Sequence, residues 1–192
     1  MTEALATPAS YHAGPWTIDE VLDLPDNGMR YELVDGRLVV SPVPPKPHQM
    51  AAKLLERLLD DAAPPKLEAN RDVSLQIRDA LLIPDVMVAT SDSLRGQEPT
   101  MDPADVVLVA EILSPGNTKF DRTWKPQRYA EGGIQIYLEI ELDGVGAPRV
   151  TAFELRGMGY VRVAEARAGE TLELTEPYDI RFDPAELAGR RG

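Results

Sequence analysis

The sequence lacks cysteine, long apolar runs and an excess of positive charge. Because none of its 192 residues is cysteine, disulfide bonds and thiolate zinc sites are excluded. No segment approaches the roughly 20 consecutive apolar residues of a membrane helix, and the N-terminal residues show no basic segment followed by an apolar core, so they predict no secretory signal. We therefore expect a cytoplasmic protein that has no membrane association.

Positive charge is scarce: 20 Lys and Arg face 32 Asp and Glu, which gives a net charge of −12. Such a chain repels polyanions at long range, whereas proteins that bind nucleic acid tightly usually carry the opposite balance. The same surplus of carboxylates suits a protein that gathers acids around a divalent cation. With 43% hydrophobic and 27% charged residues the composition is that of an ordinary globular chain, which excludes complete disorder.

The chain is expected to form one domain, residues 16–192, preceded by a flexible tail of residues 1–15. A capping-box pattern from Thr17 to Glu20 predicts a short helix that stops at Pro25. The segment Arg30 to Val40 predicts two strands around an Asp-Gly turn, because residues that tolerate positive φ are favoured at such turns.

Two further helices are predicted from apolar spacing and from capping residues. The first has one buried stripe and ends at Pro64-Pro65; the second spans about Trp124 to Glu131 and ends at Gly132-Gly133. The stripe consists of Met50, Ala51, Leu54, Leu55, Leu58 and Leu59.

The remaining pattern predicts strands. Val106 to Leu113 is almost wholly apolar, which is typical of a central strand covered on both faces. We therefore expect an α/β fold in which helices flank a mixed central β-sheet, followed by a β-rich C-terminal meander and a last short helix from Asp183. The other strands are expected at 73–77, 85–89, 134–142, 150–155, 160–163, 171–174 and 178–182.

Two acidic residues interrupt these strands. Asp85 follows Pro84 at the start of a short strand, and Glu111 lies inside the apolar run 106–113. Burying a carboxylate without a partner costs several kcal/mol, so each acid requires a cation or a hydrogen-bond network. If the two strands are neighbours, both acids converge on one Mg²⁺ ion; the alternative is a carboxylate satisfied by an arginine or by backbone amides.

Four basic residues follow Glu111 at intervals of three: Lys119, Arg122, Lys125 and Arg128. At 100° per residue they would spread around a helix and would not share one face. Pro126 fits only the first turn of a helix, so the segment is expected to be part loop and part helix. It is either an ordinary solvated surface or a patch that faces phosphate beside a metal site.

Five segments in this order resemble one known family, the Uma-type endonucleases of the restriction-endonuclease-like superfamily, which carries the PD-(D/E)xK signature. The resemblance extends from about Thr17 to Leu187. The segments are Arg30-Tyr31-Glu32-Leu33-Val34-Asp35-Gly36, Pro47-His48-Gln49, Pro84-Asp85-Val86, Glu111-Ile112-Leu113-Ser114-Pro115, and Asp121-Arg122 with Lys125 and Tyr129.

The resemblance implies roles for residues of this chain. Asp85 and Glu111 would bind Mg²⁺ or Mn²⁺, and Glu32 would complete the metal shell. The superfamily lysine normally lies two residues after the second acid, but Leu113 occupies that position here; in this family the lysine is on the following helix, which indicates Lys125. Its amine would orient or deprotonate the attacking water, or stabilise charge on the phosphate.

For other residues the resemblance implies less specific roles. His48 and Gln49 match a motif near the same site without an assigned role, while Lys119, Arg122 and Arg128 would bind phosphate. A lone histidine more often caps or packs than ligates, and Glu32 has the alternative of pairing with an arginine.

The sequence also departs from the family after Gly133. The family pattern is roughly Glu-Tyr-Trp-x-Val-Asp, whereas this chain reads Ile136-Tyr137-Leu138-Glu139-Ile140-Glu141. Pro126, directly after the expected catalytic lysine, is a second departure. Both bear on whether the protein is active.

Three functions are compatible with these observations. The first is a Mg²⁺-dependent DNA endonuclease, weak or partner-dependent because of the net charge of −12, and by resemblance a homodimer that cuts both strands. The second is a catalytically inert binding or regulatory module on the same fold. The third is a structural protein in which the two strand acids form internal ion pairs.

Overall fold

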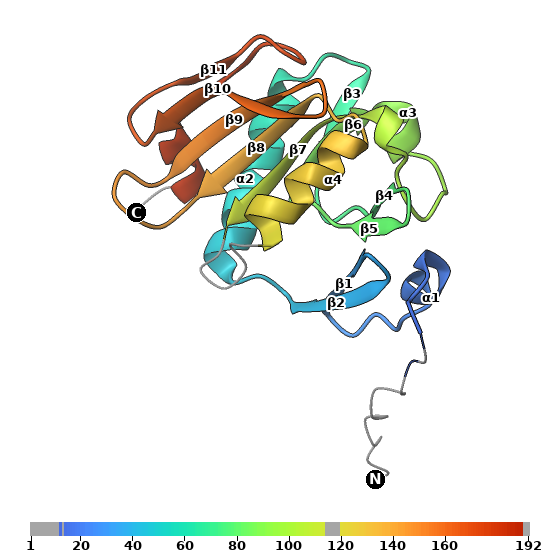
Figure 1. The fold of residues 1–192 in the computed structure, drawn as a ribbon. Coiled ribbons are helices and arrows are strands. Elements are labelled where there is room, and N and C mark those ends of the chain that lie inside the picture. The colour runs from blue at the N-terminus through green and yellow to red at the C-terminus, as the bar shows by residue number, and fades with distance from the viewer. Residues whose placement is uncertain (1–11, 13, 114–119, 190–192) are drawn as a thin grey trace.

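A computed structural model describes residues 12, 14–113 and 120–189, and its centre is a six-stranded sheet in the order β10-β9-β8-β7-β6-β3 (Figure 1). Strands β7 and β8 pair parallel, whereas the other neighbours pair antiparallel, so the sheet is mixed as expected. The strands are β3 (Leu67–Asn70), β6 (Val86–Thr90), β7 (Val106–Leu113), β8 (Ile136–Glu141), β9 (Arg149–Arg156) and β10 (Gly159–Arg167).

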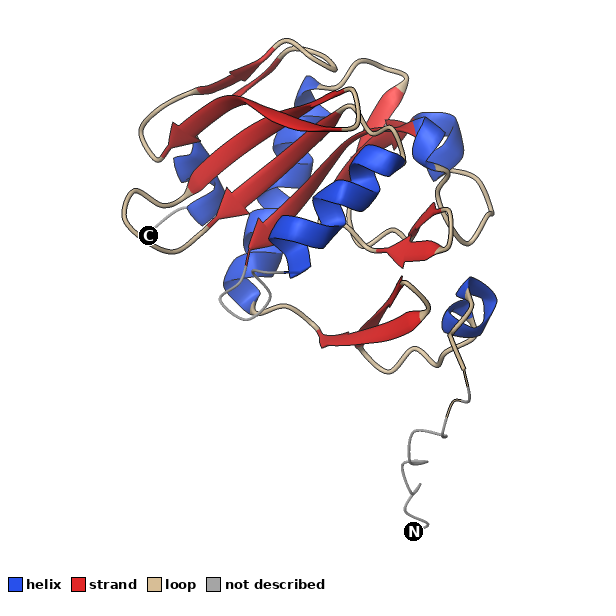
Figure 2. Cartoon of the chain, viewed as in Figure 1, coloured by secondary structure: helices blue, strands red, loops and turns tan. Residues whose placement is uncertain are grey.

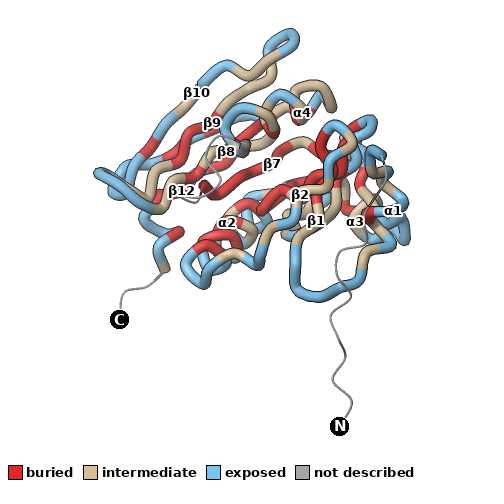
Figure 3. The backbone as a smooth tube through the Cα atoms, turned by 60° about the horizontal axis from the view of Figure 1, so that its bottom comes forward, coloured by how far each residue is buried: buried red, intermediate tan, exposed pale blue. Residues whose placement is uncertain are grey.

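Helices α2 (Lys46–Ala62) and α4 (Lys125–Glu131) cover opposite faces of this sheet (Figure 2). Side chains alternate between the faces of a strand. On β7, Leu108, Ala110 and Ile112 therefore pack in the cluster that contains α2, whereas Val109 packs in the cluster of Tyr129 on α4. Glu111, at the next odd position, consequently faces α4. The central strands are buried on both sides (Figure 3).

A second sheet, in the order β2-β1-β5-β4, lies beside the central one. Strands β1 (Met29–Val34) and β2 (Arg37–Pro42) form the predicted hairpin, with Asp35 at φ +47° and Gly36 at φ +72° in its turn. Strand β5 (Ala80–Leu82) pairs with β1 through Leu33 and Leu81, and β4 (Leu75–Ile77) completes the sheet. This pairing fixes the first hairpin against the rest of the chain.

The remaining elements are short. Helix α1 (Ile18–Leu22) has the capping box predicted between Thr17 and Glu20, and the last turn (Pro184–Ala188) has one between Asp183 and Glu186. The others are α3 (Ser91–Leu94), a 3-10 turn (Pro103–Asp105), a π-helical turn (Phe120–Trp124) and the two-stranded sheet of β11 (Leu172–Leu174) and β12 (Ile180–Phe182).

The predicted α/β class, central sheet and flanking helices are confirmed, with differences in detail. Strands β3 and β5 were not predicted, and the strand expected at 73–77 is limited to β4. The stripe prediction is wrong at Met50, which is 50% exposed. Most of the expected tail, residues 1–15, lies outside the described residues.

No helix in the described part of the chain is both long and apolar enough to span a bilayer.

Helix α2 is expected to be held to the sheet by Leu55, which is fully buried. Replacing a buried leucine by alanine typically costs 2–5 kcal/mol through lost transfer energy and a cavity, so Leu55→Ala should lower the free energy of unfolding by about 3 kcal/mol in urea denaturation. Met50→Ala, on the exposed side of the same helix, should change it by less than about 1 kcal/mol. Equal effects of the two variants would contradict the observed orientation of α2.

Candidate active site

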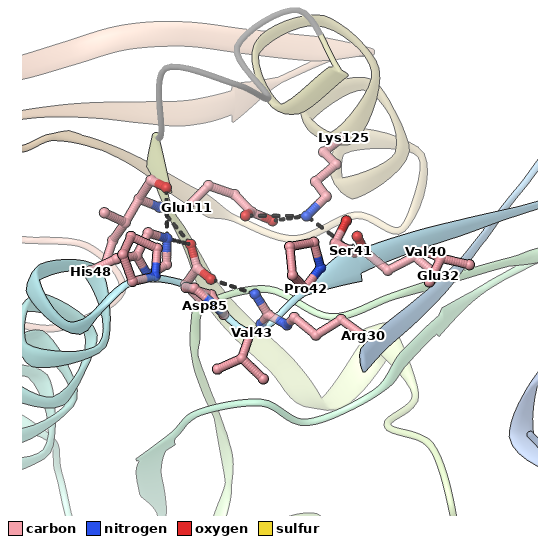
Figure 4. Close-up of a pocket in the computed structure, with 13 residues that line it drawn as sticks. Arg30, Glu32, Val40, Ser41, Pro42, Val43, His48, Asp85, Glu111 and Lys125 are labelled. Carbon is pink, nitrogen blue, oxygen red and sulfur yellow. Dashed lines mark hydrogen bonds and ion pairs between the residues drawn. The ribbon is translucent and has the colours of Figure 1, made fainter. Parts of the chain in front are cut away.

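A pocket of about 310 Å³ lies where the C-terminal part of β7 meets the first hairpin and the N-terminal ends of α2 and α4 (Figure 4). Pro42, Val43, Pro44 and Pro45 form part of its apolar wall. Its charged and titratable lining consists of Arg30, Glu32, His48, Asp85, Glu111 and Lys125.

Asp85 and Glu111 come from neighbouring strands. In the antiparallel register of β6 and β7, Val86 is opposite Ala110, so Asp85, one residue earlier, comes level with Glu111. Both are buried, at 4% and 3% exposure. The condition set for the two acids to converge, that their strands are neighbours, is therefore met.

Lys125, the first residue of α4, lies between two carboxylates. Its Nζ is 3.1 Å from Oε1 of Glu32 and 3.1 Å from Oε1 of Glu111, and it also donates to Oε2 of Glu111 at 3.2 Å. Its side chain is 4% exposed. An ammonium in this position compensates two buried negative charges that would otherwise be strongly unfavourable.

Tyr129 supports the same carboxylate from the next turn of α4, because residues four apart share one helix face. Its hydroxyl donates to Oε1 of Glu111. Burial and the neighbouring charge of Glu111 raise the pKa of Tyr129 well above its ordinary value, so the hydroxyl keeps the proton that it donates.

Arg30 and Glu32 are two residues apart on β1 and therefore lie on one face of the strand. Oε1 of Glu32 accepts a hydrogen bond from the backbone N–H of Ile83 at 2.9 Å. Arg30 donates from Nη1 to Oδ1 of Asp85 at 2.9 Å and from Nη2 to Oδ1 of Asp72 at 3.0 Å. The hairpin thus contributes one acid and one base to the pocket.

His48, near the start of α2, contacts both Asp85 and the strand that carries Glu111. Its Nε2 is 2.9 Å from the carbonyl oxygen of Ile112 and 3.2 Å from Oδ2 of Asp85. Because a carbonyl oxygen only accepts, Nε2 carries a proton and donates it. The backbone N–H of Ile112 also donates to Oδ2 of Asp85, at 2.8 Å.

These contacts shift the pKa values of both groups. Burial alone would raise the pKa of Asp85, but the hydrogen bond and charge of His48, together with Arg30 and Lys125, lower it to about 2. Burial alone would lower the pKa of His48, but its hydrogen bond to Asp85 and the charge of that carboxylate raise it overall. Asp85 is therefore ionised at neutral pH.

The pocket is lined by atoms of the kind that bind metal ions, namely carboxylate oxygens and the His48 ring. Among the described residues, no three His, Asp or Glu side chains are grouped so that they could hold a metal ion. Mg²⁺, however, usually takes one or two protein carboxylates and fills its other positions with water and phosphate oxygen. Asp85 and Glu111 supply oxygen ligands of that kind, so the donor set fits one Mg²⁺ or Mn²⁺ ion bound by two carboxylates.

The chain was compared with models of known protein families. Residues 18–185 match the model of the Uma2 family, which is described as "Putative restriction endonuclease". The chain belongs to this family. The sequence resemblance to the Uma-type endonucleases is thereby confirmed, and no curated protein matches the chain.

The crystal structure of a "putative nuclease" from Anabaena variabilis superposes on the Uma2 chain with a TM-score of 0.73 at 17% sequence identity. The alignment covers 91% of this chain and 98% of that one. At this identity the likeness shows a shared, nuclease-like fold.

Other residues singled out in the Uma2 sequence lie elsewhere. Gln49 donates from Nε2 to the carbonyl of Pro44 at 2.7 Å and does not line the 310 Å³ pocket. Arg122 pairs with Glu141, and its Nε is 3.8 Å from Oε1 of Glu139. Gln49 thus contacts the backbone of the pocket wall without lining the pocket, whereas Arg122 pairs with acids outside it.

Arg128 pairs with Glu131 at 2.9 Å and with Asp35, and it lies over the ring of Trp124 at 4.8 Å. Arg122, Lys125 and Arg128 therefore point to different partners, as the spacing of three predicted. Lys119 is outside the described residues. The phosphate-binding role of Lys119, Arg122 and Arg128 stays a prediction.

Two contributors to the site were missed in the sequence. Arg30 was noted only as part of the family resemblance, although it lies two residues before Glu32 on a predicted strand, a spacing that places both on one face. Tyr129 was given no role, although it lies four residues after Lys125 on the predicted helix. Both could have been found by inspecting the residues two positions from a site residue on a strand and four positions from one on a helix, because these share its face.

Removing the ammonium of Lys125 should destabilise the fold. In Lys125→Met, a change of similar volume, Glu32 and Glu111 lose a shared cation, and breaking a buried ion pair in this way typically costs 3–5 kcal/mol. Urea denaturation at pH 7 should show a loss of about 3 kcal/mol. Lys53→Met, at an exposed position of α2, should stay within about 0.5 kcal/mol of wild type; an equally small effect of Lys125→Met would show that the pair is not stabilising.

The raised pKa of His48 predicts a stability that depends on pH. Because the folded protein holds this proton more tightly than the unfolded chain, the contribution is fully present below the ordinary value of 6.5 and is lost as pH rises through the raised pKa. The chain has two histidines and no cysteine, so few groups titrate near neutrality. The free energy of unfolding should fall as the pH rises above about 6.5.

His48→Gln should remove most of this slope, and His12→Gln should leave it unchanged. An NMR titration of the His48 ring should show the raised pKa directly. An unaltered slope in His48→Gln would mean that other groups cause the dependence.

Proposed function

We propose that this Uma2 protein is an endonuclease that hydrolyses phosphodiester bonds in DNA with a Mg²⁺ or Mn²⁺ ion bound by Asp85 and Glu111. The observation that carries the proposal is the contact of buried Lys125 with Glu111 in a pocket that Asp85 also lines. A buried ion pair often adds little net stability, because removing both charges from water is costly. Ionisable groups gathered in a pocket are, in contrast, typical of functional sites.

Each residue of the proposed site has a chemical task. A bound divalent ion would polarise the phosphoryl oxygen and make a water molecule more acidic. Asp85 is ionised, as a metal ligand must be, because the hydrogen bond and charge of His48 and the charges of Arg30 and Lys125 lower its pKa to about 2. Lys125 holds its ammonium 3.1 Å from Glu111, where the same group reaches a water molecule or stabilises charge that develops on the phosphate.

Glu32 and Tyr129 act through these residues. Glu32 contacts Lys125 at 3.1 Å and holds its Nζ from strand β1, while Tyr129 donates to Glu111 and restricts its rotation. Glu32 was expected to complete the metal shell; its contact with Lys125 supports a role in placing the lysine as well.

The net charge of −12 supports weak or partner-dependent binding of DNA, because long-range repulsion lowers both affinity and the rate of encounter. One set of these residues acts on one strand at a time. Cutting both strands therefore calls for a second copy of the chain, the homodimer that the resemblance implies.

The main alternative is an inert binding or regulatory module on the same fold. The ion pairs favour it, because Arg30 pairs with Asp85 and Lys125 pairs with Glu111. The same pairs are expected if the two acids have a purely structural role. Affinity for divalent metal separates the nuclease from the structural alternative, and turnover separates it from the inert module.

The test combines metal titration with cleavage of supercoiled plasmid. Calorimetry with Mg²⁺ and Mn²⁺ should show binding to wild type and loss of binding in Asp85→Asn and Glu111→Gln, which keep the side-chain shape. Nicking should fall at least about 100-fold in both, and in Lys125→Ala as well, the range for loss of electrostatic or acid–base assistance. Metal binding by Lys125→Ala should persist.

Glu139→Gln is the matched control, because Glu139 is the register partner of Glu111 on β8 but does not line the 310 Å³ pocket. Its metal affinity and nicking should equal those of wild type. Metal binding without any nicking would favour the inert module, and absence of metal binding in wild type would leave the ion pairs as structural features.

A further inference from the structure

Arg30 joins the site pocket to a second pocket beside it. Its guanidinium extends from Asp85, which lines both pockets, to Asp72, which lines the second one, of about 480 Å³. The Arg30 side chain is 17% exposed, that of Asp85 5% and that of Asp72 66%. The arginine therefore connects a buried carboxylate with one at the surface; Figure 4 shows its contact with Asp85.

The carboxylate of Asp85 has donors on both oxygens. Arg30 donates to Oδ1 at 2.9 Å, while the N–H of Ile112 and Nε2 of His48 lie 2.8 and 3.2 Å from Oδ2. Any cation that binds Asp85 approaches the positive charge of Arg30. Two like charges a few ångströms apart in a partly buried site repel strongly, so Arg30 opposes the binding of a second cation unless it moves.

Arg30 has other partners available at its far end. Nη2 donates to Oδ1 of Asp72 at 3.0 Å and to the carbonyl of Ile83 at 3.3 Å. Its buried Nε finds no hydrogen-bond partner among the described residues, so the present position does not satisfy all five N–H groups of the guanidinium. If Asp85 binds a metal ion and no longer accepts from Arg30, the arginine can still donate to Asp72 and to the carbonyl of Ile83.

Building on the proposed function, we propose that Arg30 is the counter-cation of Asp85 in the metal-free protein and that Asp72 retains Arg30 when a divalent metal ion takes Asp85. Arg30 then lowers the affinity for metal, and Asp72 raises it by drawing the arginine away. Both are positioning residues, since neither need touch the metal ion. Because Arg30 competes with the metal ion for Asp85, a higher ion concentration is needed to fill the site.

The proposal predicts opposite effects of two substitutions. In calorimetric titration with Mn²⁺, Arg30→Gln should bind at least about tenfold more tightly than wild type, which corresponds to removal of one close positive charge. Asp72→Asn should bind several-fold more weakly. In the double variant the substitution at Asp72 should have no effect, because there is no arginine left to retain.

A second readout needs no activity. Without metal, the thermal stability of Arg30→Gln should be lower than that of wild type, because Asp85 loses its partner. On addition of Mn²⁺ its melting temperature should rise by more than that of wild type, since tighter binding to the folded state stabilises it further.

Two neighbours supply matched controls. Arg71 lines the second pocket but pairs with Glu56 at 2.6 Å, and Asp26 lines the same pocket but accepts from the N–H of Gly28. Arg71→Gln and Asp26→Asn change the charge of this region by the same amounts without touching the contacts of Arg30. Both should bind Mn²⁺ like wild type.

The outcomes that would overturn the proposal are distinct from those that would overturn the proposed function. If wild type binds Mn²⁺ through Asp85 and Glu111 but Arg30→Gln binds no more tightly, the competition is refuted and the metal site stands. If neither wild type nor Arg30→Gln binds Mn²⁺, the proposed metal site itself fails, and the competition fails with it. If Arg30→Gln does not fold, Asp72→Asn decides, and unchanged or tighter binding by that variant refutes the proposal.

Discussion

The charge of Glu111 in the central sheet is the constraint on which the site depends. A carboxylate on a strand between apolar neighbours requires a cation or hydrogen-bond donors close to it, and Lys125 supplies a cation at 3.1 Å. For this contact α4 must begin over the end of β7, and its next turn then brings Tyr129 to the same carboxylate. The first hairpin adds Glu32 on the other side of the amine. The positions of three separate elements are thus linked through one buried charge.

The ionisable groups form two chains of alternating sign that meet at the strand pair β6–β7. One runs from Glu32 through Lys125 to Glu111, and the other runs from Asp72 through Arg30 to Asp85 and His48. Such networks are costly to bury, and breaking one member leaves a neighbour uncompensated. They explain how an acidic chain keeps basic groups at its site. Each base is paired with an acid, and the positive charge does not appear as a basic surface.

An acidic residue in an otherwise apolar strand can be recognised in the sequence. The side chain that it contacts in the fold is much harder to predict. Glu111 and Asp85 stood out because a strand should be apolar, but strand order and register decide what a carboxylate meets, and these depend on the whole fold. Lys125 was found through the family resemblance. Strands β3 and β5, of four and three residues, were missed although strands as short as β4 and β12 were predicted. Met50 was predicted buried because an apolar stripe does not reveal how wide a contact the sheet makes with α2.

The departures from the family pattern after Gly133 lie outside the lining of the 310 Å³ pocket. Ile136 and Leu138, where the family has an acid and an aromatic residue, lie in the apolar core on the α2 face of the sheet, and Glu139 and Glu141 pair with Arg122 outside the 310 Å³ pocket. Pro126 is in the first turn of α4, where its missing N–H costs no helical hydrogen bond. These substitutions leave the pocket lining intact. In the proposed mechanism, the difference between an active nuclease and an inert module would depend on whether Arg30 and Lys125 yield their carboxylates to a metal ion.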